Sequence, residues 1–444
     1  MSELKQDLSL SGLTMIAVGS CIGVGIFITP AQVASHLGNA NLIFLAWAIG
    51  GMMAVTGALT FAELGGLFPK TGGVYVFLKE AYGDLIAFLY GWVILLVITS
   101  GALAALSLAF AHFLNFIIPI PESYIKFIAI LLILFLAAIN IMGIKIGDLF
   151  SKIFSGLKLL GILFIVLVAV FLSNPEARAI NFGELSLPDQ IGPAIAAALV
   201  GVFFSFGGWH HTSYLAGETK NPEKNIPRAM IIGASIVTIA YLLVNLAYLL
   251  MLPMGQVASS NAIAADSMNS VFKFGAIIVA TIIVLSTFGT VGIYTITAPR
   301  IYFAMAKDKI FFNFLTKLHP KYKTPASAIL VQAVWTCVLI LFWGTFASLI
   351  EYVVFMDWIF MTLAAISIFI FRKKLSTTIR PYKTIGYPII PLVFIGISVW
   401  FIYQMLHLEH EDDAIINNPI LIALIITLLG LPVYFFFKLK SKRN

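Results

Sequence analysis

The chain has 444 residues, of which 60% are hydrophobic and only 11% are charged, and its mean hydropathy is +1.01. Because soluble domains carry about 25% charged residues, this composition excludes a water-soluble protein. The net charge of +7 does not indicate nucleic-acid binding, since the lysines and arginines fall in alternate loops between apolar stretches. Cys21 and Cys337 lie within such stretches and predict no disulfide framework.

Apolar runs long enough to cross a bilayer core of about 30 Å recur along the whole chain. We therefore predict an all-α integral membrane protein with twelve transmembrane helices. In chain order the predicted spans are 10–37, 42–67, 84–117, 124–143, 148–172, 190–218, 227–252, 269–306, 326–347, 349–371, 385–407 and 415–438. No small-residue cleavage site ends the first run, so we expect it to be retained as a span and not removed as a signal peptide.

The loops on one side of the membrane collect most of the cations, and the opposite loops collect acids. Residues 220–228 and 438–443 are examples of the basic side, whereas residues 409–413 contain four acids. Positive residues stay cytoplasmic, so both termini are expected inside a cell (inner or plasma) membrane. An even number of spans requires the same arrangement.

Glycines interrupt two of the predicted spans. Gly23 and Gly25 lie within the first span, and Gly207-Gly208 lies within the sixth. A glycine in a helix costs about 1 kcal/mol relative to alanine, and unwound backbone in a membrane is tolerated only where it is buried or lines a cavity. Close helix packing is the alternative explanation. A matched pair of broken helices instead indicates the binding site of a secondary transporter.

The spacing of the spans predicts an internal repeat. The two broken spans lie about 180 residues apart, and the spans that follow them are offset similarly. Since five spans is an odd number, the second unit must enter the membrane upside down. We predict one transporter domain, 1–444, with inverted five-helix repeats at 10–172 and 190–371 and with helices 11 and 12 at 385–438.

The two breaks predict the substrate site. A break in the first span creates a helix N-terminus at Ile26 and Phe27, whose free amides favour a carboxylate, and frees carbonyls near Gly19 that could accept from an ammonium group. Phe206 and Trp209 are candidate gates, with ordinary packing as the alternative for both. The predicted substrate-binding residues are Cys21, Ile22, Gly23, Val24, Gly25, Ile26, Ser205, Phe206, Gly207 and Gly208.

Lys158 is the most informative charged residue. It lies ten residues into the fifth span, about 15 Å deep, where an ionisable side chain is a functional hypothesis by default. It could replace a bound cation or carry a coupling proton; the alternative is snorkelling to the interface. Asp357, about 12 Å into the tenth span, either lines an external vestibule or caps a helix defect. Adjacent His210 and His211 make a poor chelate, so we expect no metal site.

The sequence contains no P-loop, HExxH, GxSxG or CxxC motif. ATP hydrolysis and covalent catalysis are therefore not expected, and neither is a cofactor. An integral-membrane enzyme would need a catalytic constellation near one interface, and a channel would need a continuous polar pore. Neither pattern is evident, because the polar residues cluster near the middle of the membrane.

Five segments resemble the amino acid–polyamine–organocation (APC) superfamily of permeases, over nearly the whole chain. The first break reads GVGIF at 23–27, and residues 62–75 resemble the superfamily signature between spans 2 and 3. Residues 206–209 and 218–229 resemble bacterial members of the L-type amino acid transporter (LAT) branch. The run RIYFAMAKD at 300–308 is similar to the pattern after span 8.

The resemblance implies the five-plus-five inverted-repeat, LeuT-like fold with discontinuous helices 1 and 6, and an α-amino acid substrate. It places Lys158, with Ser286 of span 8 nearby, where sodium-coupled relatives hold sodium. Transport is therefore expected to be sodium-independent. Heteromeric relatives attach a partner through an external cysteine near span 4, and residues 117–126 contain none. We thus expect no disulfide-linked partner. His210-His211 departs from the family pattern without an interpretation.

The sequence thus predicts a sodium-independent amino acid transporter that works by alternating access as an exchanger (antiporter). Span 3 offers small residues at 99–102, and no unpaired acid is evident to match a cationic side chain, so small neutral L-amino acids are expected. A proton-coupled symporter is the alternative within this class. The exact substrate, the stoichiometry and the oligomeric state do not follow from the sequence.

Overall fold

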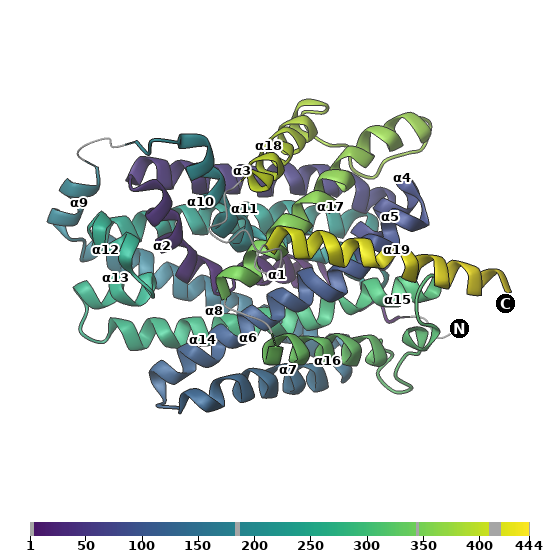
Figure 1. Ribbon diagram of the computed structural model, residues 1–444, viewed down its shortest axis with the longest axis horizontal. Helices are drawn as coiled ribbons and strands as arrows, with labels where there is room; N and C mark the ends of the chain where they lie inside the picture. The colour runs from purple at the N-terminus through teal and green to yellow at the C-terminus, as the bar shows by residue number, and fades with distance from the viewer. Residues whose placement is uncertain (1–3, 183–186, 343–345, 408–418, 444) are drawn as a thin grey trace.

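The computed structural model describes residues 4–182, 187–342, 346–407 and 419–443, and these parts are almost wholly helical (Figure 1). The first half contains α1 (Leu10–Cys21), α2 (Gly25–Leu37), α3 (Ala40–Leu67), α4 (Val74–Tyr82), α5 (Asp84–Val93), a π-helical turn η1 (Ile94–Ile98), α6 (Thr99–Ile117), η2 (Glu122–Tyr124), α7 (Ile125–Ile141), α8 (Ile144–Phe171) and α9 (Pro175–Asn181). The second half contains α10 (Ile191–Phe206), η3 (Trp209–Glu218), α11 (Pro222–Met251), α12 (Met254–Ser259), α13 (Ile263–Val271), α14 (Gly275–Thr297), α15 (Pro299–Lys307), η4 (Asn313–Thr316), α16 (Ala326–Phe342), α17 (Phe346–Lys374), α18 (Ile389–Leu406) and α19 (Pro419–Arg443).

These helices confirm the all-α membrane architecture in outline. Within the described residues, eleven helical stretches are long and apolar enough to cross a membrane, and α16 is a shorter apolar helix at the place of the ninth predicted span. The third span is a composite of α5, η1 and α6, and the eighth continues from α14 into α15. Parts of the predicted spans 326–347 and 415–438 lie outside the described residues.

Local signals set several helix ends. The Asn39 side chain accepts hydrogen bonds from the amides of Asn41 and Leu42 and so caps the start of α3. Gly38, with a φ of 59°, ends α2 in the left-handed conformation that glycine adopts without strain. A two-residue turn between α2 and α3 therefore reverses the chain direction at the end of the first span.

Helices of the first four spans pack against their counterparts in the second group of five. The pairs in contact are α2 with α10, α3 with α11, α6 with α14, and α7 with α16. In Figure 1 both termini lie at one end of the molecule, while α9, α12 and α13 lie at the opposite end. This arrangement agrees with the five-plus-five fold and with an even number of crossings.

The N-terminal segment is tied to the inner half of the sixth span. The amide of Leu8 donates to the carbonyl of Glu218 at 2.9 Å, and the amide of Lys220 donates to the carbonyl of Leu8 at 3.0 Å. The Ser9 side chain then caps α1 by accepting from the amide of Gly12. The beginning of α1 is thereby held against the end of η3.

Candidate functional site

Both predicted helix breaks are present and are confirmed by the backbone. The first span stops at Cys21 and resumes at Gly25, and the sixth stops at Phe206 and resumes at Trp209. Gly208 has a φ of +116°, which L side chains rarely adopt, so the second break requires glycine. The inner half of the sixth span, η3, is a ten-residue 3₁₀ helix.

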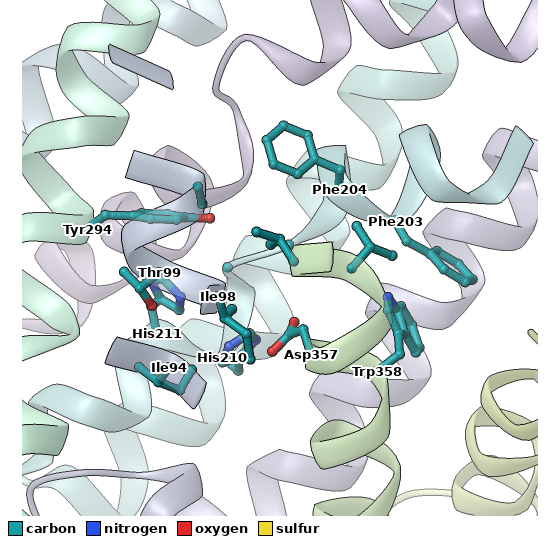
Figure 2. A pocket seen from close by; sticks show the side chains of 15 residues that line it. Ile94, Ile98, Thr99, Phe203, Phe204, His210, His211, Tyr294, Asp357 and Trp358 are labelled. Carbon is teal, nitrogen blue, oxygen red and sulfur yellow. The ribbon is translucent and has the colours of Figure 1, made fainter. Parts of the chain in front are cut away.

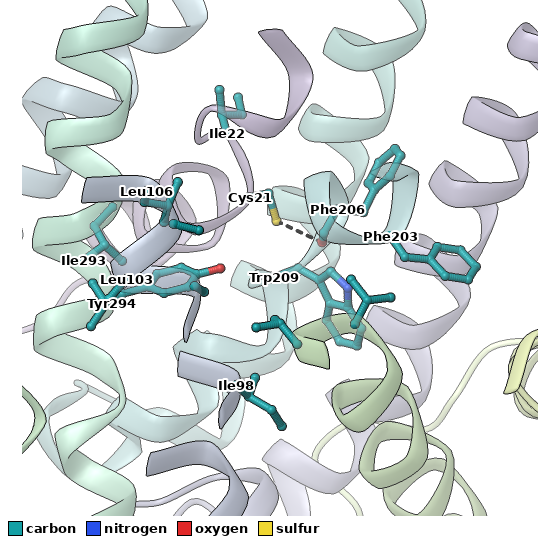
Figure 3. Packing of buried hydrophobic residues seen from close by; sticks show 14 of the residues in the cluster. Cys21, Ile22, Ile98, Leu103, Leu106, Phe203, Phe206, Trp209, Ile293 and Tyr294 are labelled. Atoms are coloured by element: carbon teal, nitrogen blue, oxygen red, sulfur yellow. Dashed lines mark hydrogen bonds between the residues drawn. The ribbon is translucent and has the colours of Figure 1, made fainter. Parts of the chain in front are cut away.

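The two breaks touch each other directly. A Cβ added to Gly25 would lie 3.1 Å from Cα of Ser205, and one added to Gly208 would lie 2.9 Å from the carbonyl carbon of Ser20. The thiol of Cys21 donates to the carbonyl of Phe206 at 3.4 Å (Figure 3). Close packing, the alternative explanation for the glycines, is therefore part of their role, and it brings the two unwound segments together.

Tyr241 of α11 contacts both breaks through its hydroxyl group. Its hydroxyl lies 2.8 Å from the carbonyl oxygen of Cys21 and 2.9 Å from that of Ser205. Its ring packs edge-on against Trp47 and Phe206. One buried hydroxyl thus lies within hydrogen-bond distance of carbonyl groups from both broken helices. The sequence pattern did not indicate this contact.

The amides at the start of α2 remain available. The amide of Phe27 donates to the carbonyl of Val24 at 3.0 Å, so the free donors begin earlier than predicted, at the Gly25 start of α2. Within the described residues, the amides of Val24, Gly25 and Ile26 make no hydrogen bond. Three free N–H groups at a helix start suit an anion such as a carboxylate.

Lys158 holds the inner half of the first span. Its ammonium donates to the carbonyl oxygen of Gly19 at 2.7 Å and to Oγ1 of Thr290 at 2.6 Å. The side chain is 1% exposed, so snorkelling to the interface is excluded. The predicted neighbour Ser286 donates to the carbonyls of Ile22 or Gly23, at 3.1 and 3.2 Å.

Thr290 is a member of this cluster that the sequence reasoning missed. Its hydroxyl lies within hydrogen-bond distance of the carbonyls of Gly19 and Ile22, at 3.1 and 3.0 Å. It follows Ser286 by one helical turn on α14, so the i, i+4 spacing of two hydroxyls was the available signal. Carbonyl and hydroxyl oxygens are the ligands that hard cations prefer, and here an ammonium occupies their centre.

A small cavity adjoins the second break. Its volume is about 30 Å³, and Gly207 and Gly208 form part of its wall. Figure 2 shows its other walls: η1 and α6 on one side, Tyr294 of α14, and Asp357 and Trp358 of α17. A second cavity, of about 20 Å³, is also lined by Gly207 and Asp357. No residue of the first break lines either cavity, so that half of the predicted site is closed in this state.

The position of Asp357 corrects two expectations. Its side chain lines both central cavities and its buried oxygen makes no hydrogen bond to the described residues, so the helix-cap alternative is excluded. The expectation that no unpaired acid faces the site is also wrong, since one carboxylate oxygen is buried without a hydrogen-bond partner in the described parts of the chain. The sequence could not show this orientation, because the helix around Asp357 is apolar on every side.

The two histidines lie in the same region. His210 and His211 are 4% and 5% exposed and line the cavity, and Nδ1 of His211 lies 3.1 Å from the hydroxyl of Thr297. Among the residues that the structure describes, no cluster of three histidine, cysteine, aspartate or glutamate side chains could hold a metal ion. The rings pack against Trp209, Tyr214 and Tyr294.

The candidate gates lie on the second cavity. Phe206 is 2% exposed and packs between Trp47 and Tyr241, with ring centroids 6.0 and 4.8 Å away. Trp209 packs edge-on against Phe61 at 5.2 Å. Both side chains line the second cavity, so both positions fit a gate, and their role in gating stays a prediction.

A buried ion pair lies near the end that carries the termini. Arg300 donates to both carboxylate oxygens of Glu218 at 2.8 Å, and neither side chain is more than 2% exposed. Nearby, Tyr75 in the loop helix α4 donates to Asp308 at 2.7 Å, and burial together with this carboxylate raises the pKa of the tyrosine. The tyrosine therefore stays a neutral donor.

Comparison with known proteins finds amino acid transporters that are similar to this chain over nearly its whole length. Residues 8–431 match the family described as amino acid permease. The chain is 32% identical to the serine/threonine exchanger SteT of Bacillus subtilis, over 98% of this chain and 97% of that protein. It is also 32% identical to the human large neutral amino acids transporter small subunit 2, over 97% of this chain and 80% of that protein, and 29% identical to the human cystine/glutamate transporter, over 99% and 87%.

The family match covers ten of the eleven long apolar helical stretches of the described residues in full and the first part of the last one. It also establishes that the protein is a transporter and not an enzyme. The chain belongs to the amino acid permease family of the APC superfamily, as a relative of the LAT branch.

Proposed function

We propose that the protein exchanges small neutral L-amino acids across the cell membrane by alternating access, without sodium. The carboxylate of the substrate binds the free amides of Val24, Gly25 and Ile26. The ammonium group binds carbonyls freed at the two breaks, with Cys21 to Ile26 and Ser205 to Gly208 as the binding segments. The five-helix units at 10–172 and 190–371 move against each other around this site.

The observation that carries this proposal is the cluster around Lys158. Its ammonium lies among the oxygens of Gly19 and Thr290, beside Ser286, where a cation would otherwise be coordinated. A fixed positive charge at this place removes the need for sodium. Two relatives whose names describe amino acid exchange or transport, the serine/threonine exchanger and the large neutral amino acid transporter subunit, support the substrate class.

Topology and partners complete the proposal. Both termini lie at the same end of the molecule as α15 (Figure 1). Since the sequence pattern puts the termini on the side of the basic loops, we place that end in the cytoplasm. Residues 117–126 contain no cysteine, so the protein is expected to work without a disulfide-linked subunit.

Counterflow in liposomes tests the function. Purified protein is reconstituted, the vesicles are loaded with unlabelled serine or alanine, and entry of labelled amino acid is followed with and without sodium. Exchange predicts saturable entry that depends on internal amino acid and not on sodium. Accumulation in empty vesicles driven by a pH gradient would instead establish proton symport, and accumulation driven by sodium would contradict both versions.

A further inference from the structure

The two central cavities share one set of wall residues. Phe203, Gly207, His210, Asp357 and Trp358 line both of them, which places the carboxylate of α17 beside the break of the sixth span. In Figure 2 the Asp357 carboxylate points into the space between η1 and the sixth span, next to the His210 ring. An acid at the middle of the membrane therefore faces both of the cavities beside the proposed substrate site.

One oxygen of this carboxylate lacks a partner in the part of the chain that the structure describes. Oδ1 of Asp357 is buried without a hydrogen bond to the described residues, and no ion pair to them reaches this side chain. The other polar side chains on the wall are those of Thr99, Tyr294, Trp358 and the two histidines, and none of them is a fixed cation. A buried acceptor without a hydrogen bond is unfavourable, and more so when it is charged, so a ligand that supplies a donor is stabilised at this place.

The rest of the wall is apolar. Ile94, Ile98, Ala102, Val353 and Val354 line the same cavity as the carboxylate on α17. When the α-amino and α-carboxylate groups of a substrate occupy the breaks, the side chain is the part that extends from Gly207 into this cavity. The pocket therefore offers apolar contact to the first side-chain carbon and a single strong acceptor beyond it.

The volume limits the length of that side chain. A site for one water molecule needs about 10–15 Å³, so a cavity of about 30 Å³ has room for about two non-hydrogen atoms. We infer that Asp357 determines substrate selectivity by accepting a hydrogen bond from a donor on a short substrate side chain. This inference rests on the proposed function. The ligand class is an amino acid with a hydroxyl or amino group on its β-carbon.

Isosteric pairs of substrates test this role. Threonine and valine differ by one hydroxyl in place of one methyl, and serine differs from alanine by the hydroxyl alone. In competition against labelled serine counterflow, we expect the wild type to prefer threonine over valine by about tenfold or more, because a site built to hydrogen-bond a substrate rejects the analogue without the donor. Asp357→Asn keeps an acceptor oxygen and should keep a preference within about threefold of the wild type.

Asp357→Leu removes the acceptor at similar size, and the ratio of threonine to valine affinity should fall to about one. Glu176→Gln, an exposed acid on α9, is the matched control and should leave the ratio unchanged. L-2,3-diaminopropionate identifies the donor: if it outcompetes serine in the wild type but not in Asp357→Asn, the donor is an ammonium, and if serine leads in both, it is a hydroxyl.

Two results would overturn the inference: equal affinity for threonine and valine in the wild type, or an unchanged preference in Asp357→Leu. The first does not depend on whether any variant folds. Failure of the wild type to exchange any amino acid would instead overturn the proposed function. Size-exclusion profiles in detergent separate loss of folding from loss of selectivity.

Discussion

Replacing Lys158 by alanine is the most direct test of the cluster that holds the first span. The change removes two hydrogen bonds donated by a charged group, at 2.7 Å to Gly19 and 2.6 Å to Thr290. The two acceptor oxygens then stay buried without this donor. Hydrogen bonds to charged groups contribute about 1.5–3 kcal/mol each. Together they stabilise the arrangement in which the inner half of the first span is docked.

Transport is affected only by the difference between the free energies that these hydrogen bonds contribute to the inward-facing and to the outward-facing state. If the other state lacks half of this contact energy, the variant shifts the conformational equilibrium by about 1.5–3 kcal/mol, which corresponds to about 10- to 150-fold. We expect exchange in proteoliposomes to fall at least tenfold, and sodium not to restore it. Lys158→Met, which keeps the apolar stem, should behave similarly, because the loss is electrostatic.

Lys152→Ala is the matched control, because Lys152 lies on the same helix and pairs with Asp148 at 2.7 Å on a partly exposed surface. Surface pairs contribute about 0–1 kcal/mol, so transport by this variant should stay within about threefold of the wild type. A rate for Lys158→Ala that equals the wild-type rate would refute the structural role of the ammonium. Restoration of that rate by sodium would show that the oxygen cluster still binds a metal cation in the variant.

The remaining predictions concern the breaks and the inner closure. Gly25→Leu should abolish amino acid uptake, since even a Cβ would lie 3.1 Å from Cα of Ser205, whereas Gly156→Leu, which faces open space, should retain it; normal uptake by the first variant would reject the proposed site. Phe206→Ala should lower the apparent affinity or let preloaded substrate leak from vesicles, and unchanged kinetics and leak would leave this ring a packing residue. Glu218→Gln should destabilise the purified protein by about 3–5 kcal/mol in thermal unfolding, because its buried arginine partner loses its counter-charge, and an unchanged melting temperature would contradict that account.

The features that the sequence revealed are those that are energetically unfavourable within their own helix. Paired glycines within apolar runs and a lysine ten residues into a span are unfavourable wherever they occur in a membrane helix, so they indicated the two breaks and the position of Lys158 without any knowledge of packing. The inverted repeat followed from equal spacing of those same signals. Ser286 entered through resemblance, and its contacts with Ile22 and Gly23 agree with that placement.

The features that the sequence did not reveal depend on how helices rotate against one another. Tyr241 and Thr290 are ordinary residues of apolar helices until tertiary packing turns them toward the carbonyls of the first span. The direction of Asp357 is of the same kind, because a helix that is apolar on all sides has no periodic signal that fixes its inner face. For this reason the prediction of an acid-free site failed while the fold prediction succeeded.

The 3₁₀ geometry of η3 fixes the register of the inner half of the sixth span. With three residues per turn and about 2.0 Å of rise per residue, its ten residues extend about 20 Å and stack in three straight rows. Trp209 at the break and Glu218 at the closure stand in one row, three full turns apart. Inserting one residue between them would rotate the closure by about 120° away from Arg300, whereas inserting three would preserve the rows and lengthen the rod by about 6 Å. The number of residues between the gate and the ion pair can therefore change only in multiples of three without turning the ion pair away. We expect natural insertions and deletions in this segment to be three residues long, or a multiple of three.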